Sequence, residues 1–133
     1  MQVVENRIKH PLEPLTTGEI TEVVAILREK KEVSEKARFA QITLHEPEKE
    51  VVVNYKDGDP FEREAHIILL EPETSETFEA VVSLTKNDVV SWEFIPDVRP
   101  GFILDEFEEV EKLVISDPDY QAALLKRGVK DPS

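Results

Sequence analysis

The sequence of 133 residues contains no cysteine, which excludes disulfides, thiolate metal sites and cysteine nucleophiles within it. It has only four glycines, and because they are scattered they cannot form a glycine-rich phosphate loop. No stretch reaches the roughly 18 apolar residues that a membrane-spanning helix needs, and residues 1–10 lack the apolar run of a secretory signal. We therefore expect a cytoplasmic protein that does not bind a membrane.

The charge is strongly acidic: 29 Asp and Glu face 16 Lys and Arg, which gives a formal net charge of −13. The two signs are interspersed along the chain, whereas binding to phosphate backbones needs clustered Lys and Arg. We therefore expect no nucleic-acid partner. With 40% hydrophobic residues, a chain of this length can bury one core but hardly two.

The first regular element is a helix that begins after Thr16. Thr16 and Glu19 have the spacing of a capping box, in which each side chain accepts a hydrogen bond from the other residue's backbone amide. Lys30 and Lys31 suit the negative end of a helix dipole. Four aliphatic side chains follow the helical spacing and predict one buried face: Ile20, Val23, Val24 and Leu27.

Strands are predicted after this helix. From Phe39 the pattern alternates, with Ala40, Ile42 and Leu44 on one face and Phe39, Gln41 and Thr43 on the other. Further apolar segments, separated by turn residues, are 51–55, 65–70, 78–84 and 89–94, and the short link at 86–88 makes the last two a hairpin. These patterns predict an α+β fold with one helix packed on a four- to five-stranded antiparallel sheet, similar to cystatin-like folds.

Prolines and a glycine at 96–101 end the sheet and mark a domain boundary. We place one domain at 1–98 and a helical segment at 99–133. Asp105 with Glu108 predicts a helix N-cap, Asp117-Pro118 predicts the start of another helix, and Gly128 is a C-cap candidate. Phe107, Val110, Leu113 and Val114 form an apolar stripe. Apolar side chains with few local partners lie along this segment: Phe107, Val110, Val114, Tyr120 and Leu124.

Several segments in this order resemble the N-terminal region of copper-containing amine oxidases, namely 10–16, 19–20, 26–28, 80–85, 89–92 and 105–108. The resemblance covers roughly residues 9–131. It implies that 1–98 is the first of two small α+β domains preceding a catalytic β-sandwich, and that 99–133 is a linker with the leading helices of the next, truncated domain.

The resemblance also implies the chemistry of the parent protein. Members oxidise primary amines to aldehydes and release ammonia and hydrogen peroxide, using one copper and topaquinone, a quinone made from a tyrosine. The implied partner of this segment is the remainder of the enzyme, and the implied parent is a homodimer.

The residues that such chemistry needs are not found in this sequence. Copper needs several imidazoles, two of them as His-x-His, but His10, His45 and His66 are isolated, so we expect surface or strand-edge histidines. Asn54-Tyr55 echoes the quinone motif Thr-x-x-Asn-Tyr-Asp/Glu but has Val51 and Lys56 at its flanks. We therefore assign no catalytic, cofactor-binding or metal-ligating residue here.

Two weaker features have simple interpretations. The acidic run Glu106, Glu108, Glu109 and Glu111 fits a solvated helix face better than an acid/base pair. Trp92 could anchor a partner, but a tryptophan within an alternating strand is more often part of the core.

Two functional hypotheses follow. The first is a noncatalytic N-terminal domain fragment of a copper amine oxidase, and the alternative is a free-standing acidic, cystatin-like module that binds a protein. A fragment should leave Phe107, Val110 and Leu124 exposed, whereas a self-sufficient module should cover them.

Overall fold

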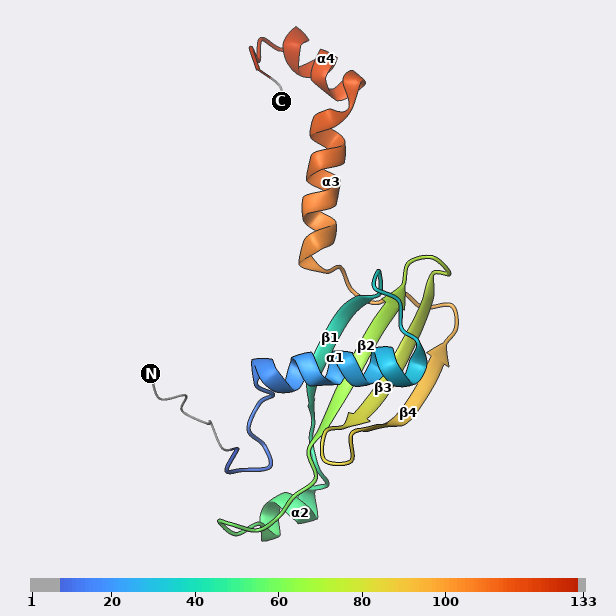
Figure 1. Cartoon of the computed structure of the whole chain (residues 1–133). Helices are drawn as coiled ribbons and strands as arrows, with labels where there is room; N and C mark the ends of the chain where they lie inside the picture. The colour runs from blue at the N-terminus through green and yellow to red at the C-terminus, as the bar shows by residue number, and fades with distance from the viewer. Residues whose placement is uncertain (1–7, 132–133) are drawn as a thin grey trace, which may run out of the picture. The chain divides into compact units, whose positions relative to one another are not determined.

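The computed structural model describes residues 8–131, and the chain divides into two compact units, Met1–Pro100 and Gly101–Ser133 (Figure 1). Among the described residues, no helix is both long enough and apolar enough to cross a membrane. The first unit contains, in chain order, α1 (Thr17–Lys31), β1 (Arg38–His45), α2 (Lys49–Asn54), β2 (Glu64–Glu71), β3 (Glu76–Ser83) and β4 (Asp88–Ile95). The second contains α3 (Leu104–Ser116) and α4 (Pro118–Lys126).

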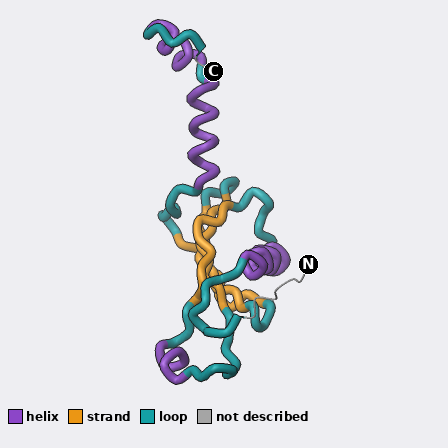
Figure 2. Tube along the Cα trace, turned by 90° about the vertical axis from the view of Figure 1, so that its left-hand side faces the viewer, coloured by secondary structure: helices purple, strands orange, loops and turns teal. Residues whose placement is uncertain are grey.

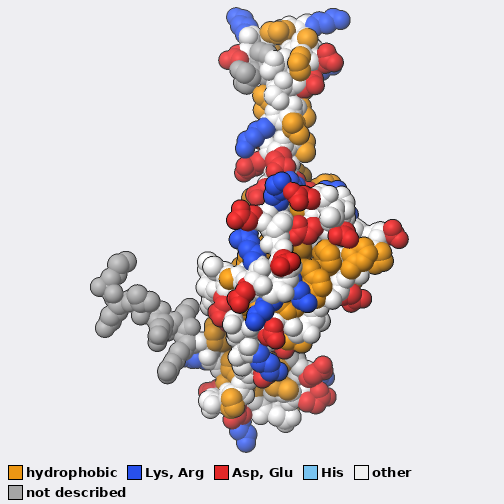
Figure 3. Space-filling model, turned by 45° about the vertical axis from the view of Figure 1, so that its right-hand side comes forward, with side chains coloured by type: hydrophobic (Ala, Val, Ile, Leu, Met, Phe, Trp, Pro, Cys, Tyr) orange, Lys and Arg blue, Asp and Glu red, His pale blue; other side chains and the backbone are white. Residues whose placement is uncertain are grey.

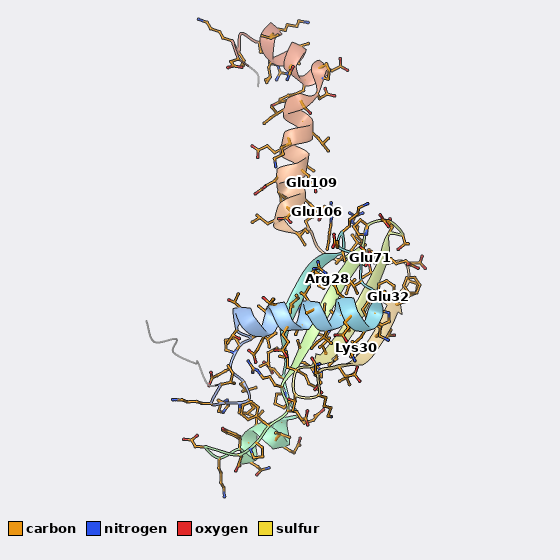
Figure 4. The ribbon with its side chains drawn as sticks, viewed as in Figure 1. Arg28, Lys30, Glu32, Glu71, Glu106 and Glu109 are labelled. Carbon is orange, nitrogen blue, oxygen red and sulfur yellow. The ribbon has the colours of Figure 1, made fainter. Side chains whose placement is uncertain are left out.

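Helix α1 begins and ends with local hydrogen bonds. The predicted capping box is confirmed: the Glu19 amide donates to Thr16 Oγ1 at 3.2 Å, and the Thr16 amide donates to Glu19 Oε2 at 2.8 Å. The helix ends at Glu32, which adopts a left-handed conformation with φ 51°. The next loop is tied to Glu71, which lies at the end of β2 (Figure 4). The Ser34 hydroxyl and amide donate to the Glu71 carboxylate at 2.7 and 3.0 Å.

The sheet is antiparallel with the strand order β1-β2-β3-β4, and α1 lies across one of its faces (Figure 2). Val23, Ile26 and Leu27 of α1 are at most 3% exposed and pack on this face. Each fully buried aliphatic side chain stabilises the fold by about 1.5–3 kcal/mol. Three cross-strand rows form the face: Phe39-Leu69-Phe78-Phe94, Ile42-Ile67-Ala80-Trp92 and Leu44-Ala65-Val82-Val89.

A β-bulge in β1 corrects the predicted alternation. The pairing passes from Phe39↔Leu69 to Gln41↔Ile68, so Ala40 has no partner on β2. Because the extra residue shifts the pleat by one position, Phe39 lies on the same face as Ile42 and joins the core cluster. The prediction had placed Phe39 on the opposite face.

The predicted strand at residues 51–55 is wrong, because this segment forms the short helix α2. The Val51 and Val52 amides donate to the Glu48 carbonyl at 3.0 and 3.3 Å. The valines favour a strand, but β2 pairs directly with β1 along its length, which leaves the segment no partner there. Local helical hydrogen bonds satisfy the backbone instead, and the sheet has four strands.

The β3–β4 hairpin is as predicted, with Asn87 in a left-handed turn conformation at φ 53°. The fold is therefore α+β, with one helix on a four-stranded antiparallel sheet followed by a helical segment. On the flank that carries β4, apolar side chains gather at the surface (Figure 3). Val90 and Phe94 of β4, and Val98 after it, are about half exposed.

The described part of the second unit contains helices α3 and α4, which have different kinds of N-cap residue. Helix α3 has its N-cap at Ile103, whose amide donates to Glu106 Oε2 at 3.1 Å. The predicted N-cap at Asp105 is wrong, because that residue already lies in the first helical turn. The N-cap residue Ile103 has no polar side chain, and the carboxylate of Glu106, three positions later, accepts the hydrogen bond from its backbone amide.

Helix α4 matches its prediction at both ends. Asp117 is the N-cap, with Oδ1 accepting from the Tyr120 amide at 2.8 Å, and Pro118 occupies the first helical position. Gly128 has φ 91°. The Gly128 and Val129 amides donate to the carbonyls of Leu125 and Leu124 at 3.0 and 3.1 Å, which is the hydrogen-bond pattern of a Schellman motif.

Candidate functional site

His45 and His66 lie on the sheet face opposite α1. Side chains alternate between the two faces of a strand, and the adjoining residues Leu44, Ala65 and Ile67 lie on the face that α1 covers. His45 Nδ1 is 2.9 Å from Glu64 Oε2, and His66 Nε2 is 2.6 Å from Glu79 Oε1. The two imidazole centroids are 6.5 Å apart. The structure thus brings two of the three histidines near each other on neighbouring strands.

His10 lies elsewhere, in the lead-in to α1, where its Nδ1 accepts a hydrogen bond from the Leu12 amide at 3.1 Å. Within residues 8–131 no three His, Asp or Glu side chains are placed to hold one metal ion. A copper site needs at least a third protein ligand beside two imidazoles. The residues present therefore do not fit the copper of an amine oxidase.

Tyr55 follows α2 directly and connects two distant segments. Its hydroxyl donates to the backbone carbonyl of Lys9, and its ring makes edge contacts with His10 and Phe61 at centroid distances of 5.2 and 5.7 Å. The next residue is Lys56, where the quinone motif requires an acid. The tyrosine thus holds the lead-in against the β1–β2 connection, and its surroundings do not fit a quinone precursor.

In the acidic run of α3, Glu106 and Glu108 each have a partner other than a carboxylate. The Glu106 carboxylate caps the Ile103 amide, and Glu108 lies 3.9 Å from the ammonium group of Lys112 one turn later. Glu109 and Glu111 are exposed. Helix spacing of this kind gives weak, solvated ion pairs.

Trp92 is half-buried in the core-facing side of the sheet. It stacks on Phe78 with the centroids 4.6 Å apart and the planes 23° from parallel. The ammonium group of Lys31 lies 5.9 Å from its centroid, within the range of a cation–π contact. The indole is therefore used within the first unit.

Arg63 forms a buried clamp that sequence reasoning missed. Its side chain is 8% exposed, and its guanidinium donates to Glu19 Oε1 at 2.7 Å and Oε2 at 3.1 Å. It also donates to the carbonyls of Glu13 and Pro14 at 2.6 and 2.9 Å. One side chain thus ties the lead-in and the start of α1 to the start of β2.

The clamp sets the electrostatics of Glu19. The hydrogen bond from Arg63 lowers the pKa of this carboxyl below its usual value, and burial acts in the opposite direction. The amide of Thr16 lowers the pKa further by donating to the same carboxylate. Glu19 is therefore held ionised while it serves both the capping box and the clamp.

The sequence signal for the clamp is weak: an arginine stands directly before β2. The pairing of Arg63 with Glu19 spans 44 positions. No local pattern predicts such a contact, because the fold alone brings the two residues together.

A shallow, open cleft of about 370 Å³ lies beside Tyr55. Its turn at 56–59 is fixed by two bonds: the Asp59 amide donates to the Lys56 carbonyl at 2.9 Å, and the Lys56 amide donates to Asp59 Oδ2 at 3.0 Å. We call it the Tyr55 cleft, and it is lined by Ile8, Lys9, Tyr55, Asp57, Gly58, Asp59 and Phe61. It combines aromatic and acidic side chains.

Comparison with known proteins finds similarity to one domain family and to several amine oxidases. The family described as "AGAO-like N2 domain" matches residues 16–92. A primary amine oxidase of Arthrobacter sp. (strain P1) is 40% identical over 123 residues, which cover 92% of this chain and 18% of that protein. A primary amine oxidase of Klebsiella aerogenes is 33% identical over 132 residues, covering 97% of this chain and 17% of that protein.

A solved structure supports the fold. The crystal structure of a copper-containing benzylamine oxidase from Hansenula polymorpha matches with a TM-score of 0.74 and 19% identity, over 88% of this chain and 19% of that chain. The chain thus spans less than a fifth of the length of these relatives.

Proposed function

The chain belongs to the AGAO-like N2 domain family, an N-terminal region of copper amine oxidases, and from this we propose that it is a noncatalytic part of such an enzyme. The observation that carries the proposal is the alignment over nearly the whole chain with proteins named primary amine oxidases. The activity belongs to the longer protein: oxidation of primary amines to aldehydes, with release of ammonia and hydrogen peroxide, at copper and topaquinone held outside this segment.

The domain assignment is part of the proposal. Residues 1–98 are the N-terminal α+β domain, and 99–133 are a linker with the leading helices of the next domain. The division into compact units after Pro100 supports a boundary in this region. Within the second unit, Phe107 and Val110 are about 60% exposed and Leu124 is half-buried, which supports a helical segment that packs against further chain.

The role of the segment is to pack beside the catalytic part and to contribute to the periphery of a dimeric parent. The half-exposed apolar side chains on the β4 flank support such packing. The histidine and tyrosine geometry supports a noncatalytic role, because each of these side chains is engaged in structural contacts.

A chimera tests this function. The matching region of the Arthrobacter primary amine oxidase is replaced by this chain, and amine-dependent peroxide release is measured with copper present. We expect an active chimera and no amine-dependent peroxide from this chain alone. A chimera carrying Ile67→Asp, which places a charge at a fully buried position, is the control and should fail to assemble.

Two outcomes would contradict the proposal. One is amine-dependent peroxide from the isolated chain. The other is a chimera that contains the folded segment and yet does not assemble.

A further inference from the structure

One turn contains the only aspartate of the sequence that is followed by glycine. This is Asp57 in the loop after α2 (Figure 1), and the next residue is Gly58. An aspartate at such a position can isomerise, because the backbone nitrogen of the next residue lies within reach of its side-chain carboxyl carbon. Glycine has no side chain to obstruct this approach, whereas a branched side chain crowds the backbone nitrogen.

The structure leaves both reacting groups of this pair free. Within residues 8–131, the Asp57 carboxylate has no hydrogen bond or ion pair, and the Gly58 amide donates no hydrogen bond. Both residues are exposed, and a Cβ added to Gly58 would meet no atom within 4 Å apart from its chain neighbours. Neither group therefore has to give up a stabilising contact before it reacts.

The turn is held at its ends and not at its tip. The Asp59 amide donates to the Lys56 carbonyl at 2.9 Å, and the Lys56 amide donates to Asp59 Oδ2 at 3.0 Å. These two bonds fix residues 56 and 59, while the peptide group between Asp57 and Gly58 makes no hydrogen bond through its nitrogen. Exposed loop tips with small residues are the places where covalent change of a chain concentrates.

Asp97 provides a matched comparison within the same chain. It is exposed, it lies in a turn, and it has no hydrogen bond or ion pair in the part of the chain that the structure describes. The residue after it is Val98 in place of a glycine. Since valine is branched at Cβ, its side chain hinders attack by its own backbone nitrogen. The two aspartates thus differ mainly in the residue that follows.

We propose that Asp57 isomerises spontaneously to isoaspartate through a cyclic imide formed with Gly58. The Gly58 nitrogen gives up its proton and forms a bond to Cγ of the protonated Asp57 carboxyl, whose hydroxyl group leaves with that proton as water. A second water then opens the ring. Cleavage of the bond from the nitrogen to Cγ restores aspartate, and cleavage of the bond from the nitrogen to the Asp57 backbone carbonyl carbon gives isoaspartate.

The product has a different backbone at this turn. The reaction releases one water and consumes one, so it needs no oxidant or reductant, and the mass of the chain is unchanged. The main chain then runs through the side-chain carbon and gains a methylene group, and the former backbone carbonyl becomes a free carboxylate. That carboxylate is the group to which an isoaspartyl methyltransferase transfers a methyl group. The proposal goes beyond the proposed function and does not rest on it.

The experiment incubates the whole chain at neutral pH and measures isoaspartate at each aspartate over time. Peptides from a digest are separated by liquid chromatography and identified by their fragment ions in mass spectrometry. Methyl transfer from labelled S-adenosylmethionine by an isoaspartyl methyltransferase confirms the product. We expect isoaspartate to form about tenfold faster at Asp57 than at Asp97, which is a difference in barrier of about 1.4 kcal/mol.

Two variants make the test directional. Val98→Gly removes the branched side chain after Asp97 and keeps the backbone carbonyl that accepts from Thr77, so isoaspartate at Asp97 should form faster than in the unchanged chain. Asp57→Glu should abolish the product at position 57, because the longer side chain would have to close a larger ring that forms more slowly. Asp57 and Val98 are exposed, and circular dichroism checks that both variants keep the fold.

A synthetic peptide of residues 52–62 gives the rate without the fold, and we expect the folded chain to react at Asp57 at a similar rate. Three results would overturn the proposal: no isoaspartate at Asp57 when the peptide forms it, equal rates at Asp57 and Asp97, or a product at position 57 that persists in Asp57→Glu. Failure here is distinct from failure of the proposed function, because this measurement does not depend on assembly of the chimera.

Discussion

The guanidinium of Arg63 donates to both carboxylate oxygens of Glu19, at 2.7 and 3.1 Å, across 44 positions of the sequence. The backbone of Arg63 also binds the first residues after β3. Its amide donates to Thr85 Oγ1 at 2.7 Å, and its carbonyl accepts from the Leu84 amide at 2.9 Å. A single residue thus joins the lead-in, α1, β2 and the start of the hairpin turn. The first predictions concern this clamp.

Arg63→Ala should lower the free energy of unfolding by about 3–5 kcal/mol, because it leaves a buried carboxylate and two carbonyls without their donor. Urea denaturation of the whole chain measures the change. The control is Lys36→Ala, which breaks the exposed Lys36–Glu73 ion pair and should leave the midpoint unchanged. Equal effects of the two substitutions would show that the buried clamp contributes no more to the free energy of unfolding than an exposed ion pair.

The clamp also predicts a dependence on pH. The pKa of Glu19 is lowered in the folded state, so its contribution to stability is present above the unfolded pKa, near 4.3, and is lost as the pH falls through the folded value. Glu19→Gln should remove this contribution, so that unfolding free energies of the variant and the unchanged chain converge at low pH. A constant difference from pH 7 to pH 2 would contradict it.

The end of α4 depends on the left-handed conformation of Gly128. Gly128→Ala should destabilise the helix end by about 1 kcal/mol, because a Cβ is disfavoured at positive φ. Hydrogen exchange of α4 amides in the whole chain should accelerate about fivefold. Gly101→Ala is the matched control, since that glycine has no positive φ and no atoms within 4 Å of an added Cβ, and it should leave the exchange unchanged.

Because α2 is helical, replacing one of its exposed valines by alanine should have the opposite effect on stability from the same change in a strand. Val53 is 71% exposed, and alanine is a better helix former than valine by a few tenths of a kcal/mol, about 0.5. Val53→Ala should therefore leave stability unchanged or raise it slightly in urea denaturation. Ile67→Ala, in the sheet core, should cost about 2–5 kcal/mol by the same measurement. A clear loss with Val53→Ala would contradict the helix.

Local chemistry explains which elements could be predicted from the sequence. The Thr16–Glu19 capping box, the Asp117-Pro118 start and the Gly128 end depend on residues within one turn, and all three are confirmed. The segments with alternating apolar residues predicted the paired strands, because this alternation is also a pattern of neighbouring residues. These patterns hold wherever tertiary contacts do not oppose them.

The features that were missed depend on non-local contacts. The bulge at Ala40 depends on the register with β2, and the helical state of Val51 to Asn54 depends on the lack of a strand partner. The Arg63–Glu19 clamp joins residues that no periodicity relates. The Tyr55 cleft likewise needs the lead-in and the β1–β2 connection to meet, which the sequence does not indicate.

The coding sequence that follows the codon for Ser133 tests most directly whether the segment belongs to a longer amine oxidase. We expect an open reading frame that continues into a Thr-x-x-Asn-Tyr-Asp/Glu motif and a His-x-His pair. A stop codon directly after Ser133 in the native gene would contradict the proposed parent enzyme.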